Sequence, residues 1–268
     1  MLLDRFNRKI DYLRISVTDR CNRRCIYCMP NEPFVHKNHA DILSYEQIEA
    51  VAKTAAKLGI TKIRLTGGEP LVRKEIERLV ARLAAIEGII ELCMTTNGSL
   101  LAEKAALLKQ AGLARLNISM DSIEPERYTR LTGGELQQTI KAIEVAIKAG
   151  FENTKINMVI LDNTTEKEIE AMQAFCREKG LHLQKIMRFS LYDRDDLSRR
   201  FQTERPPKCQ VCNRLRLTAD GFLKPCLFSD DEIRLNFDDI EGSIRKAVFG
   251  KAKSGTACKN RFMNQIGG

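Results

Sequence analysis

The sequence has no long apolar run, few aromatic residues and no low-complexity segment. Its longest uncharged apolar stretches, such as residues 159–161, are far shorter than the ~20 residues that a membrane-spanning helix needs. The N-terminal residues contain no apolar core of a secretory signal. A composition of 43% hydrophobic and 29% charged residues excludes a disordered or collagen-like chain. We therefore expect a globular, cytoplasmic protein without a membrane partner.

An excess of basic residues gives the 268-residue chain a formal net charge of +9 at pH 7. This charge favours an anionic partner such as a nucleotide, a phosphate or a nucleic acid, although it is equally compatible with a role in solubility. Aromatic residues make up only 6% of the chain, and no recognised DNA- or RNA-binding motif is present. A metal-stabilised nucleic-acid-binding module is therefore a disfavoured alternative, and we expect no nucleic-acid partner.

The cysteines carry more information than the charge. There are nine, and an odd number argues against a disulfide framework and for metal-bound thiolates in a reducing compartment. Six of them form two groups: Cys21, Cys25 and Cys28, and Cys209, Cys212 and Cys226. A structural zinc site takes four ligands, and no histidine is placed as a clear fourth ligand of the first group. Three thiolates leave one position open, as in an iron–sulfur cube. Cys93 and Cys176 stand alone and are expected to be buried core thiols.

Residues 44–180 repeat the order of an amphipathic helix, a glycine and a short β-rich run. Ser44 with Gln47, and Thr165 with Glu168, form capping boxes that begin two helices. Glycines at positions 59, 88, 112, 150 and 180 follow helical segments, where a left-handed residue is favoured. Strands are expected over residues 13–17, 60–65, 89–94, 113–119, 154–161 and 181–187. This alternation predicts an α/β fold with a mostly parallel sheet.

The pattern stops after residue 187. Residues 193–208 are polar and unpatterned, and residues 215–223 read as a hairpin that turns at Asp220 and Gly221. We therefore infer a parallel-sheet unit over residues 1–190 and a small C-terminal module over residues 191–268. The final two glycines would ordinarily form a frayed tail.

Short polar motifs follow the first four strands, at residues 18–21, 66–70, 95–98 and 119–122. The carboxyl ends of parallel strands open on one edge of the sheet, where α/β proteins build their sites. Any one of these motifs is compatible with an ordinary βα loop, because Thr, Ser, Asp and Gly are good loop residues. Four of them together with a cysteine triplet predict an active site.

The first cysteine group, CNRRCIYC over residues 21–28, resembles the CxxxCxxC signature of the radical SAM enzymes, and GGEP at residues 67–70 matches a second feature of that superfamily. The second group, CQVCNRLRL at 209–217 with PCLF at 225–228, resembles the GTP 3′,8-cyclase family of molybdenum-cofactor biosynthesis. The ending MNQIGG does so too. The resemblance implies a partial (β/α)6 TIM-like barrel of the radical SAM type, with a C-terminal module that carries a second Fe–S cluster.

The resemblance to the radical SAM superfamily implies the roles of the first cysteine group and its neighbours. Cys21, Cys25 and Cys28 would hold a [4Fe-4S] cluster whose open iron binds S-adenosylmethionine (SAM). One electron would cleave the sulfonium and yield a 5′-deoxyadenosyl radical. The matching SAM contacts are Tyr27, Gly68 and Ser119.

The resemblance to GTP 3′,8-cyclases implies that Cys209, Cys212 and Cys226 hold a second [4Fe-4S] cluster, whose free iron receives the guanine base. The radical would remove the ribose 3′ hydrogen, and C3′ would join C8 of the purine. The matching contacts to GTP are Arg14, Arg64, Thr95, Lys155, Arg214 and Arg216. The family also implies an electron donor, a homodimer and a downstream molybdenum-cofactor enzyme that takes up the product.

The chain departs from the family pattern at two places. The sixth strand reads QKIMRF over residues 184–189 where the family has an Arg-Phe-Ile-Glu-Phe-Met stretch, so Lys185 or Arg188 would have to replace the arginine. Only about twenty residues separate this strand from Cys209, where the family has several tens. A different substrate therefore stays open.

Cys258 carries a second alternative. It is either an unliganded buried thiol or a fourth ligand that closes the second cluster. The latter would favour a radical SAM enzyme with an auxiliary cluster that acts on a peptide or another small molecule.

Overall fold

The computed structural model describes residues 1–28, 35–192 and 209–267. Its strands form one sheet in the order β6-β5-β4-β3-β2-β1-β7-β8-β9. All neighbouring pairs from β6 to β7 are parallel, and the pairs β7–β8 and β8–β9 are antiparallel. The strands are β1 Tyr12–Ser16, β2 Lys62–Thr66, β3 Glu91–Thr96, β4 Arg115–Ser119, β5 Lys155–Ile160, β6 His182–Met187, β7 Arg214–Leu217, β8 Phe222–Lys224 and β9 Ile233–Arg234.

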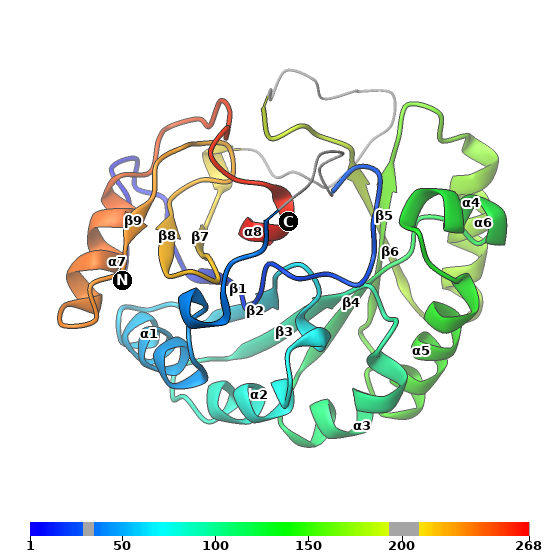
Figure 1. The fold of residues 1–268 in the computed structure, drawn as a ribbon, viewed down its shortest axis with the longest axis horizontal. Helices are drawn as coiled ribbons and strands as arrows, with labels where there is room; N and C mark the ends of the chain where they lie inside the picture. Colours follow the sequence, from blue (N-terminus) through cyan, green and yellow to red (C-terminus); the bar gives the residue numbers. More distant parts are fainter. Residues whose placement is uncertain (29–34, 193–208, 268) are drawn as a thin grey trace.

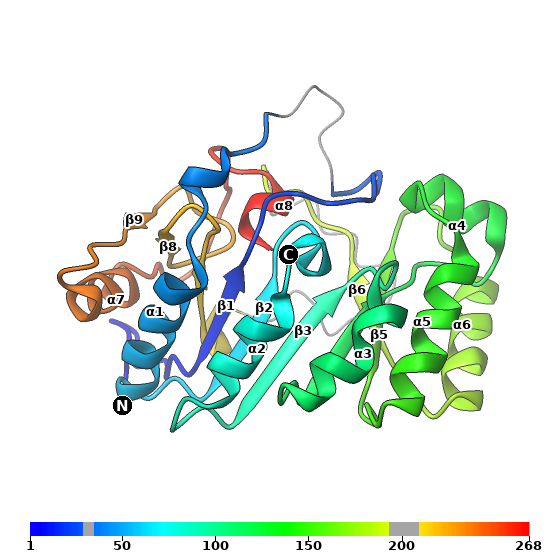
Figure 2. The same cartoon turned by 60° about the horizontal axis from the view of Figure 1, so that its bottom comes forward.

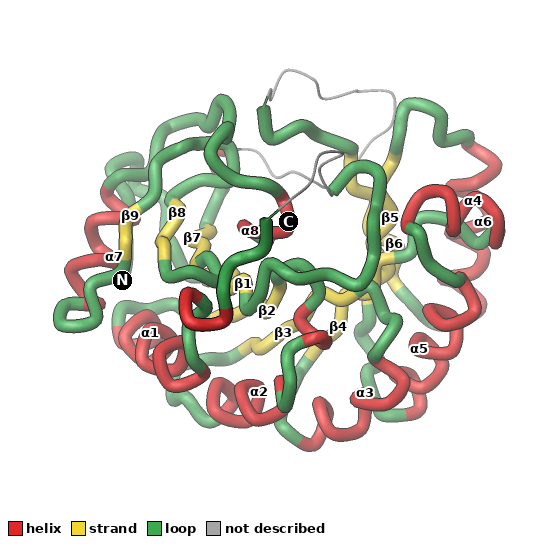
Figure 3. Tube along the Cα trace, in the orientation of Figure 1, coloured by secondary structure: helices red, strands yellow, loops and turns green. Residues whose placement is uncertain are grey.

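Helices cover the outer side of this curved sheet (Figures 1 and 3). They are α1 Tyr45–Lys57, α2 Ile76–Ala84, α3 Leu101–Gln110, α4 Pro125–Thr132, α5 Leu136–Lys148, α6 Glu166–Glu178 and α7 Ile240–Phe249. The short helix α8, Met263–Ile266, lies on the inner side of the sheet. In the part of the chain that the structure describes, three 3-10 turns lie at His39–Asp41, Pro70–Val72 and Cys209–Val211. None of the helices in the described ranges is long and apolar enough to cross a membrane.

The strands separate an apolar face from a polar one. In β1, Leu13 and Ile15 are fully buried in the core, and the core face of α1 packs against the same cluster. The intervening residues Arg14 and Ser16 are buried on the other face, toward the barrel interior. Because side chains alternate along a strand, a correctly predicted strand also predicts which of its residues face the barrel interior.

The sequence-based predictions of the elements are largely confirmed. All six predicted parallel strands are present, and both capping boxes form, at Ser44 and at Thr165. All five predicted glycines have positive φ. Cys93 and Cys176 are both buried as expected. Cys176 lies in the apolar core cluster, whereas Cys93 Sγ contacts Glu91 and Arg115. The partial TIM-like barrel is thus confirmed.

The C-terminal segment continues the barrel sheet. The predicted hairpin forms β7 and β8 with its turn at Asp220 and Gly221, and β7 pairs directly with β1. The expectation of a frayed tail is wrong for Gly267, which is buried and accepts a hydrogen bond from Arg216 Nη1 at 2.7 Å. The polar stretch predicted over residues 193–208 lies outside the described residues.

Candidate active site

A cavity of ≈ 200 Å³ opens at the carboxyl edge of the parallel strands. The first cysteine triplet lines it together with the GGEP loop, the residues after β3, the end of β4 and the tail residue Met263. Figure 2 shows α8 beside the C-terminal end of β1, and Asn264 Nδ2 donates to the Asp19 carbonyl oxygen at 2.9 Å. The predicted SAM contacts Tyr27, Gly68 and Ser119 all line this cavity, as does Thr95.

The three thiols of the first triplet are close enough to affect one another. Burial raises the pKa of each, most strongly for Cys25, and raises that of Cys28 to about 12. For Cys25 and Cys28, the neighbouring thiols add to the rise. Thiolates at these positions therefore need a bound cation to offset both burial and mutual repulsion.

Two polar side chains fix the loop that carries the triplet. Asn97 Nδ2 lies 3.9 Å from Cys21 Sγ and donates to Asn22 Oδ1 at 2.9 Å. Tyr27 Oη donates to Asp121 Oδ2 at 2.5 Å, and Asp121 Oδ1 accepts from the Val159 amide at 2.8 Å. The loop after β1 is thus tied to the residues that follow β3 and β4.

The GGEP loop packs directly on the loop after β1. The Gly68 amide donates to the Thr18 carbonyl oxygen at 2.8 Å. A Cβ on Gly68 would lie 2.2 Å from the Arg20 carbonyl oxygen, so only glycine allows this approach. The absent Cβ of Gly68 thus makes room for the backbone of the loop after β1.

Glu69 is fully enclosed beneath the cavity. Its carboxylate accepts hydrogen bonds from the amides of Leu71 and Asn97 and from the Thr96 hydroxyl, at 2.7–3.0 Å. Burial raises the pKa of Glu69 to about 7, against the lowering effect of those hydrogen bonds. The sequence analysis singled out the glycines of this motif. It did not predict that the Glu69 carboxylate is buried and joins the GGEP loop to the residues at the end of β3.

Three arginines stand in register on adjacent strands below the cavity. Arg14 of β1 pairs with Arg64 of β2 on one side and with Arg216 of β7 on the other. We call them the arginine row; their exposed fractions are 7%, 4% and 5%. Neighbouring strands lie roughly 4.8 Å apart. Like charges on neighbouring strands of a buried face repel each other. A bound anion would relieve this repulsion.

Tyr12 lies two residues before Arg14 on β1, and its hydroxyl group links Arg14 to Arg64. Its hydroxyl oxygen accepts from Arg64 Nε at 2.6 Å and from Arg14 Nη1 at 3.3 Å. Burial acts to raise the pKa of Tyr12, but the two arginines outweigh it and lower that pKa from its usual value of 10.0. Arg64 Nη1 also donates to Thr95 Oγ1 at 3.2 Å, which connects the row to the cavity wall.

The second triplet lies at the opposite end of the barrel. Cys209 and Cys212 precede β7, and Cys226 follows the antiparallel strand β8, so all three lie near the amino end of β1. Residues 251–255 approach two of the sulfur atoms: Lys251 Nζ lies 3.9 Å from Cys212 Sγ, and Ser254 Oγ lies 3.8 Å from Cys209 Sγ.

The donor sets fit clusters better than single ions. Within the described ranges, no three Cys, His, Asp or Glu side chains converge on a position for one metal ion. This disfavours structural zinc, which needs four ligands on a single centre. In an iron–sulfur cube each thiolate binds a different iron, so the sulfur atoms stand further apart. The three thiols of each triplet are the donor type that such a cube takes, and the second cluster is taken up under the proposed function.

The remaining predicted residues lie around the barrel interior. Lys155 lines a separate pocket of ≈ 360 Å³ with Arg115 and His182. The Arg214 guanidinium lies 5.5 Å from the centre of the Tyr12 ring. Of the two proposed replacements on the sixth strand, Arg188 lines the cavity and pairs with Asp162 at 3.2 Å.

Cys258 is a buried thiol. Its Sγ lies 3.3 Å from Asn260 Oδ1, and it packs in a small apolar cluster with Leu191 and Ile266. Burial raises its pKa, against the effect of Lys224. These contacts favour the unliganded thiol over a fourth ligand to the second cluster.

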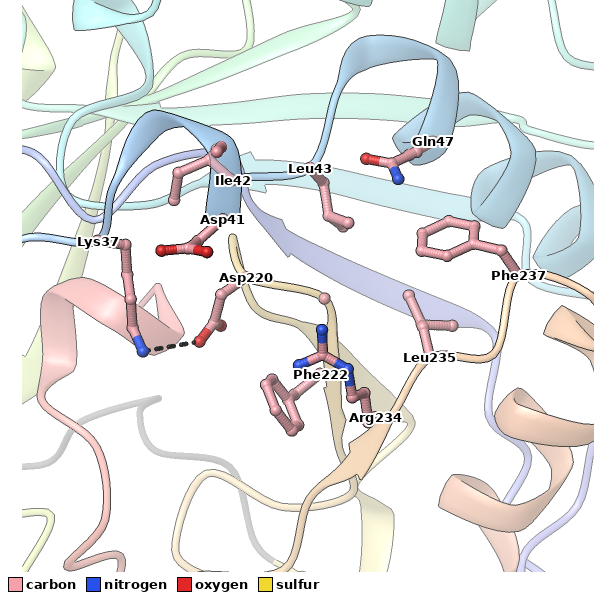
Figure 4. Close-up of a pocket in the computed structure, with 12 residues that line it drawn as sticks. Lys37, Asp41, Ile42, Leu43, Gln47, Asp220, Phe222, Arg234, Leu235 and Phe237 are labelled. Atoms are coloured by element: carbon pink, nitrogen blue, oxygen red, sulfur yellow. Dashed lines mark ion pairs between the residues drawn. The ribbon is translucent and has the colours of Figure 1, made fainter.

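A larger pocket of ≈ 430 Å³ lies between the segment before α1 and the β8–β9 strands (Figure 4). Lys37 Nζ pairs there with Asp220 Oδ2 at 3.2 Å, and Asp220 also pairs with Arg261 at 2.7 Å. No cysteine lines it. Although this pocket is larger than the cavity at the carboxyl edge, we therefore do not assign the reaction to it.

Comparison with known proteins agrees with this geometry. Residues 15–176 match the model of the Radical SAM superfamily. The GTP 3′,8-cyclase of Petrotoga mobilis is 36% identical, with 100% of both chains covered. That of Peptoclostridium acidaminophilum is 38% identical over 92% of this chain and 87% of its own. The Petrotoga alignment spans 323 positions, of which this chain can fill 268, so at least 55 have no counterpart here.

Solved structures of other proteins share the fold. SuiB of Streptococcus suis, bound to precursor peptide SuiA, has a TM-score of 0.70 at 16% identity, and the match covers 91% of this chain and 66% of that chain. Native anSMEcpe with bound AdoMet has a TM-score of 0.67 at 18% identity, with 90% and 81% covered. These identities show the fold alone. The family model and the full-length identity to cyclases place this chain in the radical SAM superfamily and, within it, in the GTP 3′,8-cyclase family.

Proposed function

We propose that this protein cleaves SAM reductively and cyclises GTP to 3′,8-cyclo-7,8-dihydro-GTP, the reaction that opens molybdenum-cofactor biosynthesis. The observation that carries the proposal is the position of the arginine row, buried between two cysteine triplets at opposite ends of one barrel. A triphosphate on the row would lie between a site for radical generation and a site for the base.

At the carboxyl edge, Cys21, Cys25 and Cys28 would hold the cluster that binds SAM. When bound, this cluster supplies the electron that splits SAM into methionine and the 5′-deoxyadenosyl radical. The chain's own part is to hold the reactants: Tyr27, anchored by Asp121, fixes one wall, and Ser119 lines the other.

Within the barrel, the arginine row would neutralise the triphosphate, because guanidinium groups bind phosphate oxygens through paired donors. Thr95, already in contact with Arg64, extends this surface toward SAM. Arg214, and Lys155 from its neighbouring pocket, would add positive charge. We assign the guanine base to the second triplet.

The proposed chemistry consumes two electrons and so requires an electron donor. One electron cleaves SAM. After C3′ of the ribose has lost its hydrogen and bonded to C8, a purine radical remains. The second electron, together with a proton, reduces this radical.

We further propose that the protein is a cytoplasmic homodimer that passes its product to a downstream molybdenum-cofactor enzyme. We also propose that the chain divides into two units between residues 190 and 191.

The alternative of a peptide-modifying enzyme is not favoured, because the proteins that match this chain along its length are named as cyclases. A deuterium transfer experiment tests the substrate directly. With GTP deuterated at C3′, reduced holoenzyme should form 5′-deoxyadenosine that carries one deuterium. Deoxyadenosine without the label, at the same yield with and without GTP, would contradict hydrogen removal from that position.

A further inference from the structure

The loop between α7 and the tail encloses the second cysteine triplet. Lys251 and Ser254 approach Cys212 and Cys209, as described above. A Cβ on Gly255 would lie 2.6 Å from Cys226 Sγ, so glycine is required for the loop to come this close. One short segment therefore contacts the sulfur atoms of all three cysteines.

Lys251 is the charged member of this loop. Its side chain is 2% exposed. Besides Cys212 Sγ, its ammonium group donates to the carbonyl oxygens of Arg214 at 2.8 Å and Pro225 at 2.5 Å. These carbonyls belong to the segments that carry Cys212 and Cys226, so one buried cation joins two separate parts of the ligand set.

Arg8 holds the same loop from the N-terminal segment. Its guanidinium donates to the carbonyl oxygens of Ala252 at 2.6 Å and Lys253 at 3.1 Å, and to that of Cys209 at 2.8 Å. Asp4 pairs with Arg8 at 2.5 Å. The position of Lys251 is therefore fixed from both sides, and its charge stays beside the sulfur atoms.

We infer that Lys251 is a positioning residue of the second cluster, which holds the ends of β7 and β8 together and presents a fixed positive charge to the Cys212 thiolate. This inference rests on the proposed function, in which the second triplet binds a cluster. Hydrogen bonds and charges beside cluster sulfur atoms set reduction potentials. Since reduction adds negative charge, loss of the ammonium group should make the cluster harder to reduce.

The test uses the full chain with Cys21, Cys25 and Cys28 changed to serine, so that the second triplet alone supplies cysteine ligands. After reconstitution with iron and sulfide, this parent is compared with the same chain carrying Lys251→Met or Lys251→Gln. Iron and sulfide content, the melting temperature of the apo chain and a redox titration followed by EPR are measured.

Lys224→Met is the matched control. Lys224 is also fully buried in the C-terminal segment, but its ammonium lies 3.6 Å from Glu232 and 3.4 Å from Asn260 Oδ1. Its charge is thus already balanced by a carboxylate. We expect Lys224→Met to leave the potential near that of the parent.

Both Lys251 variants should disfavour reduction at least tenfold, which is about 59 mV for one electron. A variant that melts like the parent but has lost its iron also supports the inference. An unchanged potential and iron content in both variants would overturn it, whatever happens to the melting temperature. A parent that binds no iron–sulfide cluster would instead overturn the cluster assignment, and with it the inference.

Discussion

Replacement of Gly267 by alanine tests the position of the tail. Gly267 has φ +73°, and an added Cβ would lie 2.1 Å from Thr66 Oγ1 and 2.9 Å from Thr66 Cβ. Thr66 cannot easily move, because it is 3% exposed on β2 and its hydroxyl donates to the Ile15 carbonyl oxygen at 3.2 Å. Alanine should therefore expel the tail rather than displace the strand.

The magnitude follows from the contacts that are lost. Left-handed backbone costs alanine about 1–2 kcal/mol. Loss of the hydrogen bond from the Arg216 guanidinium to the Gly267 carbonyl oxygen removes a further ~1.5–3 kcal/mol. A total of about 3 kcal/mol or more lowers the equilibrium constant for docking of the tail by ~100-fold or more.

Hydrogen exchange of the backbone amides of residues 263–267 measures this docking. Protection should fall strongly in Gly267→Ala. Gly180→Ala is the matched control, since Gly180 has φ +65° but no atom within 4 Å of an added Cβ. It carries the backbone cost alone, away from the tail. Full protection of the tail in Gly267→Ala would refute the reasoning.

Three further predictions concern the two ends of the site and its buried carboxylate. Arg216→Ala should reduce formation of the cyclised product at least tenfold while iron content stays near wild type; unchanged turnover in a product assay would remove the arginine row from substrate recognition. Cys25→Ala should abolish formation of 5′-deoxyadenosine, and retention of that product would contradict the assignment of the first cluster. Because the pKa of Glu69 is raised by burial to about 7, from its usual 4.5, the folded apo chain binds this proton more tightly than the unfolded chain. The stabilisation that Glu69 provides is fully present below pH 4.5. As the pH rises through 7, the free energy of unfolding falls by about 3 kcal/mol. Chemical denaturation at pH 5 and pH 8 should show a smaller loss in Glu69→Gln, and equal losses in both proteins would count against the enclosed carboxylate.

The sequence predicts the elements whose signals are local. Capping boxes at Ser44 and Thr165 are complete within four residues, and the strands between them are short β-rich runs. Helix α4 was not predicted: it has no capping box, Glu124 caps it with its own carboxylate ahead of Pro125, and no predicted strand follows it.

The site depends on long-range register, which the sequence does not display. Arg14 and Arg216 were each matched to a family contact, but their pairing across β1 and β7 joins residues some two hundred positions apart. Lys251 offered no motif at all, because its role comes from burial against Cys212. The position of Gly267 likewise follows from its fit to Thr66.

The central claim is tested most directly by one anaerobic turnover. Iron- and sulfide-reconstituted protein is incubated with SAM, dithionite and GTP, and 5′-deoxyadenosine is followed together with the pterin derived from 3′,8-cyclised GTP. The two products should rise together, which would also show that the positions missing relative to the cyclases are dispensable. Deoxyadenosine without the pterin would contradict the cyclase while keeping the radical SAM chemistry, and neither product would contradict both.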